Sequence, residues 1–233
     1  MTFFVYALEI IGTVAFAISG AMVGMKKRMD IFGVCILGLV TACGGGAIRD
    51  VLLGKLPPVM FRDSSYGATA IIASIIVLLP IVQRAISREQ KIYDQLMLVA
   101  DSAGLGVFTA VGTAAAIDAG FGSNYLFCIF LGAVTGVGGG ALRDVLAGNP
   151  PYIFVKHIYA CASILGAILY VALEQPLGKT AAMLICVFSV FITRLLAARF
   201  HWSLPKANLQ YLTKSGAKKN FRKNFNKNFK KRP

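Results

Sequence analysis

The sequence predicts an all-α membrane protein with seven transmembrane helices, arranged as an inverted repeat of three plus three helices followed by a seventh helix. Hydrophobic residues make up 57% of the 233 residues and charged residues 15%, whereas soluble domains carry about 25% charged residues. Seven apolar runs are long enough to cross a hydrocarbon layer of about 30 Å. A motif in the second run also returns in the fifth.

The apolar runs alone define the expected helices. They cover residues 3–25, 31–53, 66–82, 96–117, 125–146, 153–173 and 180–198. None alternates every two residues as a transmembrane β-strand does. The first run contains Glu9, and its basic residues follow it instead of preceding it. We therefore expect it to remain as a helix and not to be cleaved as a signal peptide.

The sequence lacks the patterns of an enzyme. It has no phosphate-binding loop, no metal-ligand spacing and no nucleophile paired with a base. The five cysteines lie inside the apolar runs, where we expect them to act as small packing residues without disulfides or metal. We expect no catalytic residue and no cofactor.

A motif of eleven residues reveals the repeat. GGGAIRDVLLG at residues 44–54 returns as GGGALRDVLAG at residues 138–148, with nine positions identical, and a pair of prolines follows each copy. A shift of 92 residues also aligns Glu9 with Asp101 and Phe16 with Phe108. Because each half holds three crossings, the second half must enter from the opposite face, as in inverted-repeat transporters.

This repeat divides the chain into four parts. We expect a first three-helix repeat at residues 1–90, an inverted second repeat at 93–178, a seventh helix at 179–203 and a basic tail at 204–233. Basic residues cluster after the first, third and seventh runs, which the positive-inside rule assigns to the cytoplasm. We therefore expect a bacterial inner-membrane protein with its N-terminus outside and its C-terminus in the cytoplasm.

The tail carries ten Lys or Arg residues after Trp202, interleaved with phenylalanines, and is expected to be disordered. Two interpretations stay open: attraction to anionic lipid head groups, worth about 1 kcal/mol per basic residue near the surface, and a solvated tail that only fixes topology. Basic and aromatic residues also interleave in proteins that bind nucleic acid, but we expect no nucleic-acid partner.

The triple glycines are the first candidate site residues. They are Gly44, Gly45, Gly46, Gly138, Gly139 and Gly140. Glycine costs about 1 kcal/mol relative to alanine inside a helix, so three in a row favour a kinked, widened or unwound helix. Such backbone is tolerated at membrane depth where it lines a watery cavity. Close packing of neighbouring helices is the alternative.

An Arg-Asp pair follows each glycine cluster. Arg49, Asp50, Arg143 and Asp144 would each cost about 2.5–3.5 kcal/mol at the centre of a membrane. They must therefore be paired, hydrated or near an interface. The symmetry suggests cross-pairing of Arg49 with Asp144 and of Arg143 with Asp50. Alternatively, the side chains extend to the membrane surface, since each pair lies close to the end of its run.

Other polar residues inside the runs are weaker candidates. Glu9 and Asp101 hold equivalent positions and could attract cations or bond to the backbone. Thr41 and Thr135 are candidate pore hydroxyls, although bonding to their own helix backbone is the commoner use. Arg194 lies near the end of the seventh run and is expected to extend to the cytoplasmic surface.

Two copies of Gly-Gly-Gly-x-x-Arg-Asp in a seven-helix inverted repeat resemble the prokaryotic trimeric intracellular cation (TRIC) channel family, also described as a glycine transporter domain. The resemblance covers residues 3 to about 200. It implies a homotrimer in the lipid bilayer, with one pore per protomer between the second and fifth helices that conducts K⁺ and, less selectively, Na⁺. The glycines would form the kinks, and the Arg-Asp pairs would line or brace the pore.

Inverted repeats serve more than one function. The second candidate is an alternating-access carrier for a small zwitterion such as glycine, with the carboxylate at a broken helix end. A third is a structural membrane protein without transport.

Overall fold

The computed structural model describes residues 3–155 and 158–202 and is helical, with no β-strand among these residues. Its elements are α1 (Phe3–Lys26), α2 (Ile31–Leu52), α3 (Val59–Arg62), α4 (Ser64–Leu78), α5 (Pro80–Ser87), α6 (Gln90–Ala116), the π-helix η1 (Ile117–Phe121), α7 (Tyr125–Leu146), α8 (Tyr152–Val155), α9 (Tyr159–Leu177) and α10 (Lys179–Arg199). By length and composition, six helices of the described part can cross a membrane, and the bent pair of α4 and α5 brings the number to seven if the pair is one span. The predicted all-α fold class is confirmed; the tail lies outside the described residues.

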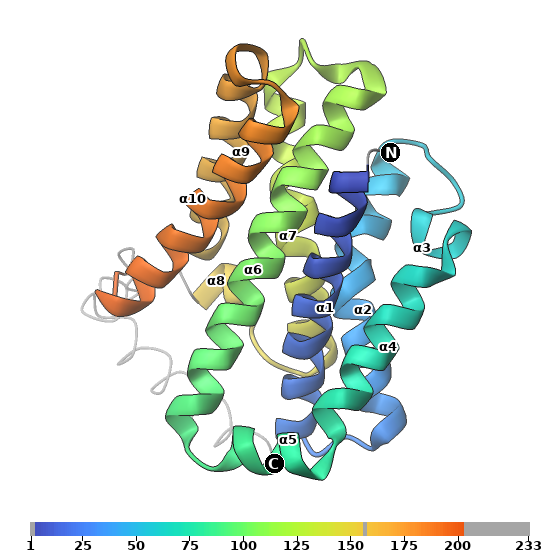
Figure 1. Cartoon of the computed structure of the whole chain (residues 1–233), viewed down its shortest axis with the longest axis vertical. Helices are drawn as coiled ribbons and strands as arrows, with labels where there is room; N and C mark the ends of the chain where they lie inside the picture. Colours follow the sequence, from blue (N-terminus) through green and yellow to red (C-terminus); the bar gives the residue numbers. More distant parts are fainter. Residues whose placement is uncertain (1–2, 156–157, 203–233) are drawn as a thin grey trace, which may run out of the picture. The chain divides into compact units, whose positions relative to one another are not determined.

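The two halves run in opposite directions. In Figure 1, α1 descends from the N-terminus, whereas the equivalent α6 ascends beside it. Phe16 of α1 and Phe108 of α6, which the repeat makes equivalent, stack with ring centroids 5.4 Å apart. Contact between equivalent residues is expected on a pseudo-two-fold axis, which therefore passes close to this pair.

Helix α6 begins at Gln90, six residues before the fourth apolar run, and two other expected helices are interrupted. The third run, 66–82, breaks at Leu79 into α4 and α5, which meet at 72°. Pro80 cannot donate a helical hydrogen bond and forces the preceding residue into an extended conformation. The sixth run, 153–173, gives only the short α8 at its start, and the long helix α9 begins at Tyr159.

The helices that carry the repeated motif share the same start and end signals. Asp30 and Asn124, which are 94 residues apart, accept hydrogen bonds from Gly33 and Phe127 and so cap α2 and α7. Gly54 and Gly148, the last residues of the motif, follow the helix ends with φ of 67° and 64°. A side chain there would be strained, so the glycines end both helices in a Schellman-type turn.

Helix α6 lies at the centre of the described bundle. In its most apolar stretch, which is 18 residues long, 78% of the residues are buried. Apolar side chains on the outer helices are exposed, for example Ile72 and Ile76 of α4, as expected of surfaces that face lipid. Cys43, Cys128 and Cys186 are buried packing residues, as expected. Cys161 is exposed on α9, so the expectation that all five cysteines pack in the interior is wrong.

Candidate functional site

Helices α2 and α7 cross at the middle glycine of each triplet. A Cβ atom added to Gly45 would collide with the carbonyl oxygen of Thr135, and one added to Gly139 would collide with the carbonyl oxygen of Thr41. In both cases the obstacle is backbone, so it cannot rotate away. Gly45 and Gly139 therefore allow the two helices to touch backbone to backbone at the centre of the repeat.

Both glycine clusters lie inside continuous α-helix, and none of the six glycines has a positive φ. The expectation of unwound backbone with free carbonyl groups is therefore wrong for the described structure. Close packing, the alternative, accounts for Gly45 and Gly139. A role for the clusters as kinks beside a pore stays a prediction.

The candidate pore hydroxyls are used locally. Thr41 donates to the carbonyl of Leu37 and Thr135 to that of Leu131, both at 2.6 Å. Each threonine also packs against a glycine of the preceding helix, Thr41 on Gly20 and Thr135 on Gly112. This is the commoner use of buried hydroxyls in helices. Both side chains are fully buried, so lining a water path would require the helices to move.

Arg49 organises a first charge cluster, which consists of Glu9, Arg49, Asp50 and Tyr66. Arg49 pairs with Asp50 at 2.9 Å and with Glu9 of α1 at 3.2 Å. Tyr66 of α4 donates its hydroxyl to the other oxygen of Glu9 at 2.5 Å. The charged members are buried, and their formal charges sum to −1.

The first charge cluster borders a small cavity of about 30 Å³. Glu9, Arg49, Asp50 and Tyr66 line it together with Thr13 and Gly46. A water molecule needs about 10–15 Å³ by the same measure, so the cavity has room for two. The first charge cluster therefore combines buried charged side chains with space for water or a small polar ligand.

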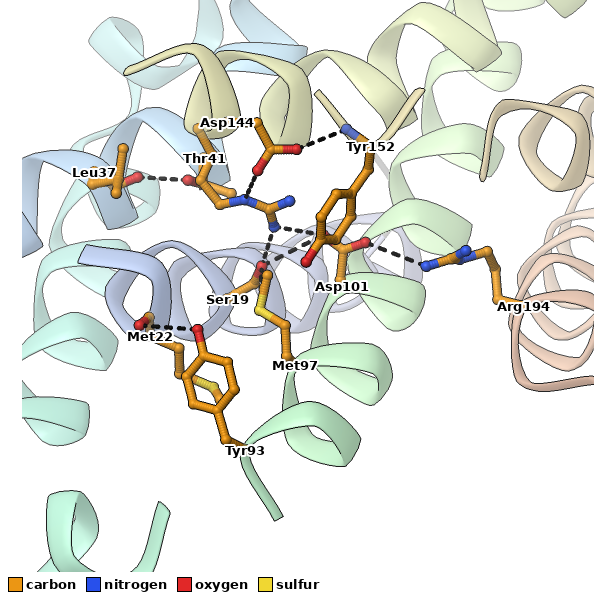
Figure 2. Close-up of polar contacts among 11 residues, drawn as sticks. Ser19, Met22, Leu37, Thr41, Tyr93, Met97, Asp101, Asp144, Tyr152 and Arg194 are labelled. Atoms are coloured by element: carbon orange, nitrogen blue, oxygen red, sulfur yellow. Dashed lines mark hydrogen bonds and ion pairs between the residues drawn. The ribbon is translucent and has the colours of Figure 1, made fainter. Parts of the chain in front are cut away.

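A second charge cluster, Asp101, Arg143, Asp144, Tyr159 and Arg194, repeats this arrangement in the second half. Arg143 pairs with Asp144 at 2.9 Å and with Asp101 of α6 at 2.6 Å. It also donates to the hydroxyl of Ser19, which in turn lies 3.4 Å from Asp101. Figure 2 shows Asp101 between Ser19 and Arg194. The formal charges of this cluster sum to zero.

The aspartate of each motif also caps the short helix that follows it. Asp50 accepts the backbone N–H of Val59 at 2.8 Å, the first residue of α3. Asp144 accepts that of Tyr152 at 2.9 Å, the first residue of α8, as Figure 2 shows. One carboxylate thus joins its neighbouring arginine to the segment after the proline pair. This explains why an arginine, an aspartate and a proline pair recur together.

The pairing differs from the expectation. Each arginine binds its own neighbouring aspartate and the acidic residue of the first helix in the same repeat, so the hypothesis of cross-pairing between Arg49 and Asp144 and between Arg143 and Asp50 is wrong. The alternative, in which the side chains reach the surface, is also wrong, because Arg49 is 5% exposed and Arg143 is fully buried.

Arg194 corrects another expectation. Its side chain does not extend to the surface but is 4% exposed, with a nitrogen 3.8 Å from Asp101 and its guanidinium carbon 4.8 Å from the ring centre of Tyr159. The repeat itself could not indicate this contact, since α10 lies outside it. Tyr66 and Tyr159 were also missed, although their spacing of 93 residues matches the repeat.

The comparisons with known proteins agree with this architecture. A family model described as "Glycine transporter" matches residues 6–80 and 98–175. The UPF0126 inner membrane protein YadS of Escherichia coli is 40% identical over 86% of this chain and 95% of its own length. The UPF0126 membrane protein YvgT of Bacillus subtilis is 35% identical over 87% of this chain and 96% of its own length.

Solved structures are similar over nearly the whole described region. A prokaryotic TRIC channel in 0.5 M KCl superposes with a TM-score of 0.80 and 31% identity, over 88% of this chain and 100% of that one. The TRIC orthologue from Rhodobacter sphaeroides superposes with a TM-score of 0.78 and 29% sequence identity, over 86% of this chain and 100% of that one. The matched family model, the relatives and the shared fold place this integral membrane protein in the trimeric intracellular cation (TRIC) channel family.

Proposed function

We propose that the chain is a monovalent-cation channel that conducts K⁺ and, less selectively, Na⁺. We further propose that it assembles as a homotrimer with one pore per protomer between α2 and α7. It would lie in the bacterial inner membrane with its N-terminus outside, and its basic tail would be free to contact anionic lipid. Relatives of known structure are described as TRIC cation channels, which supports the cation-channel part of this proposal.

The observation that carries the proposal is the pair of buried charge clusters on the two helices that cross at Gly45 and Gly139. Charged groups inside a membrane are expensive and usually belong to ion pathways or proton relays. Here each half of the repeat places an Arg-Asp pair on one of the two crossing helices, and the preceding helix, α1 or α6, adds a second carboxylate. A cation that moves along α2 and α7 would meet both clusters in turn.

The first charge cluster supports attraction of cations over anions. Its surplus negative charge borders the cavity of about 30 Å³, and Glu9 and Asp50 both line that cavity. In the described conformation the backbones of α2 and α7 touch at Gly45 and Gly139, with no room for an ion between them. We propose that conduction requires α2 and α7 to separate there, and that the flanking glycines make the helices pliable enough to do so.

Single-channel recording from the purified protein in planar lipid bilayers tests the function. We expect unitary currents with K⁺ that far exceed about a thousand ions per second, the turnover of an alternating-access cycle whose conformational change takes about a millisecond. Glu9→Gln should lower the unitary K⁺ conductance, because it removes the surplus negative charge. Slow, saturable glycine counterflow without unitary steps would contradict the channel and favour the carrier.

A further inference from the structure

Arg194 is the least firmly bound of the buried arginines. Arg49 and Arg143 each make hydrogen bonds of normal length to two carboxylates. Arg194 instead lies 3.8 Å from one oxygen of Asp101, which is too long for a hydrogen bond. Among the described residues, its Nε and Nη2 atoms and this Asp101 oxygen are buried without a hydrogen-bond partner.

The surroundings of Arg194 are therefore those of a charge held by electrostatics and not by specific hydrogen bonds. Asp101 uses its first oxygen for Arg143 and Ser19 and turns its second toward Arg194. The face of Tyr159 lies against the guanidinium, which favours any cation at this position. Figure 2 shows Arg194 reaching toward Asp101 from the side opposite to Ser19.

The net charge of the second charge cluster depends on Arg194. Without Arg194, the second charge cluster would sum to −1, as the first does with Glu9, Arg49 and Asp50. The seventh helix, which lies outside the repeat, thus supplies the positive charge that makes the second cluster neutral. No described residue outside the repeat is ion-paired with the first cluster.

We propose that Arg194 is a tethered counter-cation, which occupies beside Asp101 and Tyr159 the position that a free monovalent cation would otherwise take. Arg194 thereby limits cation binding at the second charge cluster and lowers cation passage along that half of the protomer. The effect on current rests on the proposed channel function, whereas the binding of a cation in place of Arg194 does not.

A direct binding experiment tests the site without any current. The melting temperature of the purified protein in detergent is measured in KCl and in choline chloride at equal ionic strength. Removal of the tethered charge in Arg194→Gln should allow K⁺ to bind and to raise the melting temperature by about 2–4 °C over choline, because a ligand of the folded state stabilises it by mass action. The unaltered protein and Arg199→Gln, which removes an exposed arginine of the same helix, should both show a smaller difference, limited to any K⁺ bound at the first charge cluster.

Bilayer recording then tests the consequence. Arg194→Gln should raise unitary K⁺ conductance about twofold or more at low ionic strength, with less effect at high salt. The double variant Arg194→Gln with Asp101→Asn is neutral again and should return to the original conductance, as should Arg194→Lys, which keeps the charge. If Arg194→Gln does not fold, Arg194→Met keeps an aliphatic stem against Tyr159 and takes its place.

The two failures are distinguishable. If the unaltered protein carries unitary currents but Arg194→Gln matches Arg199→Gln in both experiments, the inference about Arg194 is overturned and the channel function stands. If the unaltered protein shows no unitary currents, the proposed function fails. The K⁺-dependent change in melting temperature then decides the role of Arg194 alone.

Discussion

The two charge clusters share a plan and differ in what surrounds it. Both join an arginine to its neighbouring aspartate and to an acidic residue of the first helix in the repeat, and both cap a short helix. In the first cluster Tyr66 bonds to Glu9 and a cavity opens beside Gly46. In the second cluster, Asp101 takes the place of Glu9 with a shorter side chain, and Arg194 approaches it. The hydroxyl of Tyr159 has no hydrogen-bond partner in the described part.

This difference shows how an inverted repeat becomes asymmetric. The shared contacts are made by residues inside the repeat, so duplication preserves them. The differences include one methylene group, Glu9 against Asp101, the hydroxyl of Ser19 in the second cluster, and one helix that the repeat does not contain. Substitutions at equivalent positions of the two halves should therefore have equal effects where the contacts are shared and unequal effects where they are not.

The largest effect is expected from removal of the arginines. Arg49→Gln and Arg143→Gln each leave buried carboxylates without their ion partner, which should lower the free energy of unfolding by about 3–5 kcal/mol. Glu9→Gln in the Arg49→Gln background restores the original charge of −1 and should recover part of the loss. Thermal or denaturant unfolding in detergent measures this. The shared plan would be contradicted if either arginine could be replaced without loss.

The middle glycines should come next. Gly45→Ala and Gly139→Ala place a methyl group against backbone on the facing helix and should each cost about 3 kcal/mol, near the upper end of overpacking effects. The free energies of unfolding of the two variants, measured under the same conditions, show whether both sides of the crossing are equally tight. A cost below about 1 kcal/mol at both sites would contradict a tight backbone contact.

The third glycines provide the matched controls. At Gly46 an added Cβ would meet only an arginine nitrogen at 3.9 Å, so Gly46→Ala should be neutral or stabilising. At Gly140 it would lie 2.6 Å from the Tyr159 hydroxyl, so Gly140→Ala should be destabilising. Equal effects at these two positions would contradict the asymmetry of the clusters.

The tyrosines should give a smaller and unequal pair of effects. Tyr66→Phe removes a hydrogen bond to a buried carboxylate and should cost about 2 kcal/mol. Tyr159→Phe removes a buried hydroxyl that has no hydrogen-bond partner among the described residues and should cost less than about 1 kcal/mol. Unfolding in detergent distinguishes the two. A larger loss for Tyr159→Phe would show that its hydroxyl bonds to a group within the second cluster.

The smallest effects should be equal. Asp30→Ala and Asn124→Ala each remove the N-cap of an equivalent helix, and each should cost about 1 kcal/mol. Clearly different losses, measured under identical conditions, would show that the ends of α2 and α7 are not equivalent. Asp30→Asn keeps a capping side chain and serves as the control that should lose little.

The fold class could be predicted from the sequence because apolar length and each copy of the motif are read from residues that are neighbours along the chain. The prediction placed α7 at its actual bounds and α2 within one residue. It misplaced the third helix because Pro80 breaks it inside an apolar run, where hydrophobicity gives no warning. It identified Glu9, Asp101 and both Arg-Asp pairs as one class of residue but paired them wrongly, because symmetry alone does not reveal which equivalent groups are within reach.

The sequence by itself determined that the chain crosses a membrane, that two inverted halves carry the same glycine and charge motif, and where α2 and α7 begin and end. Composition, hydropathy and helix capping depend on residues that are neighbours along the chain. Only the tertiary structure decided that Gly45 meets Thr135, that each arginine binds within its own half, and that Arg194 joins Asp101. These contacts join residues 90, 40 and 93 positions apart, and their distances depend on how the helices pack.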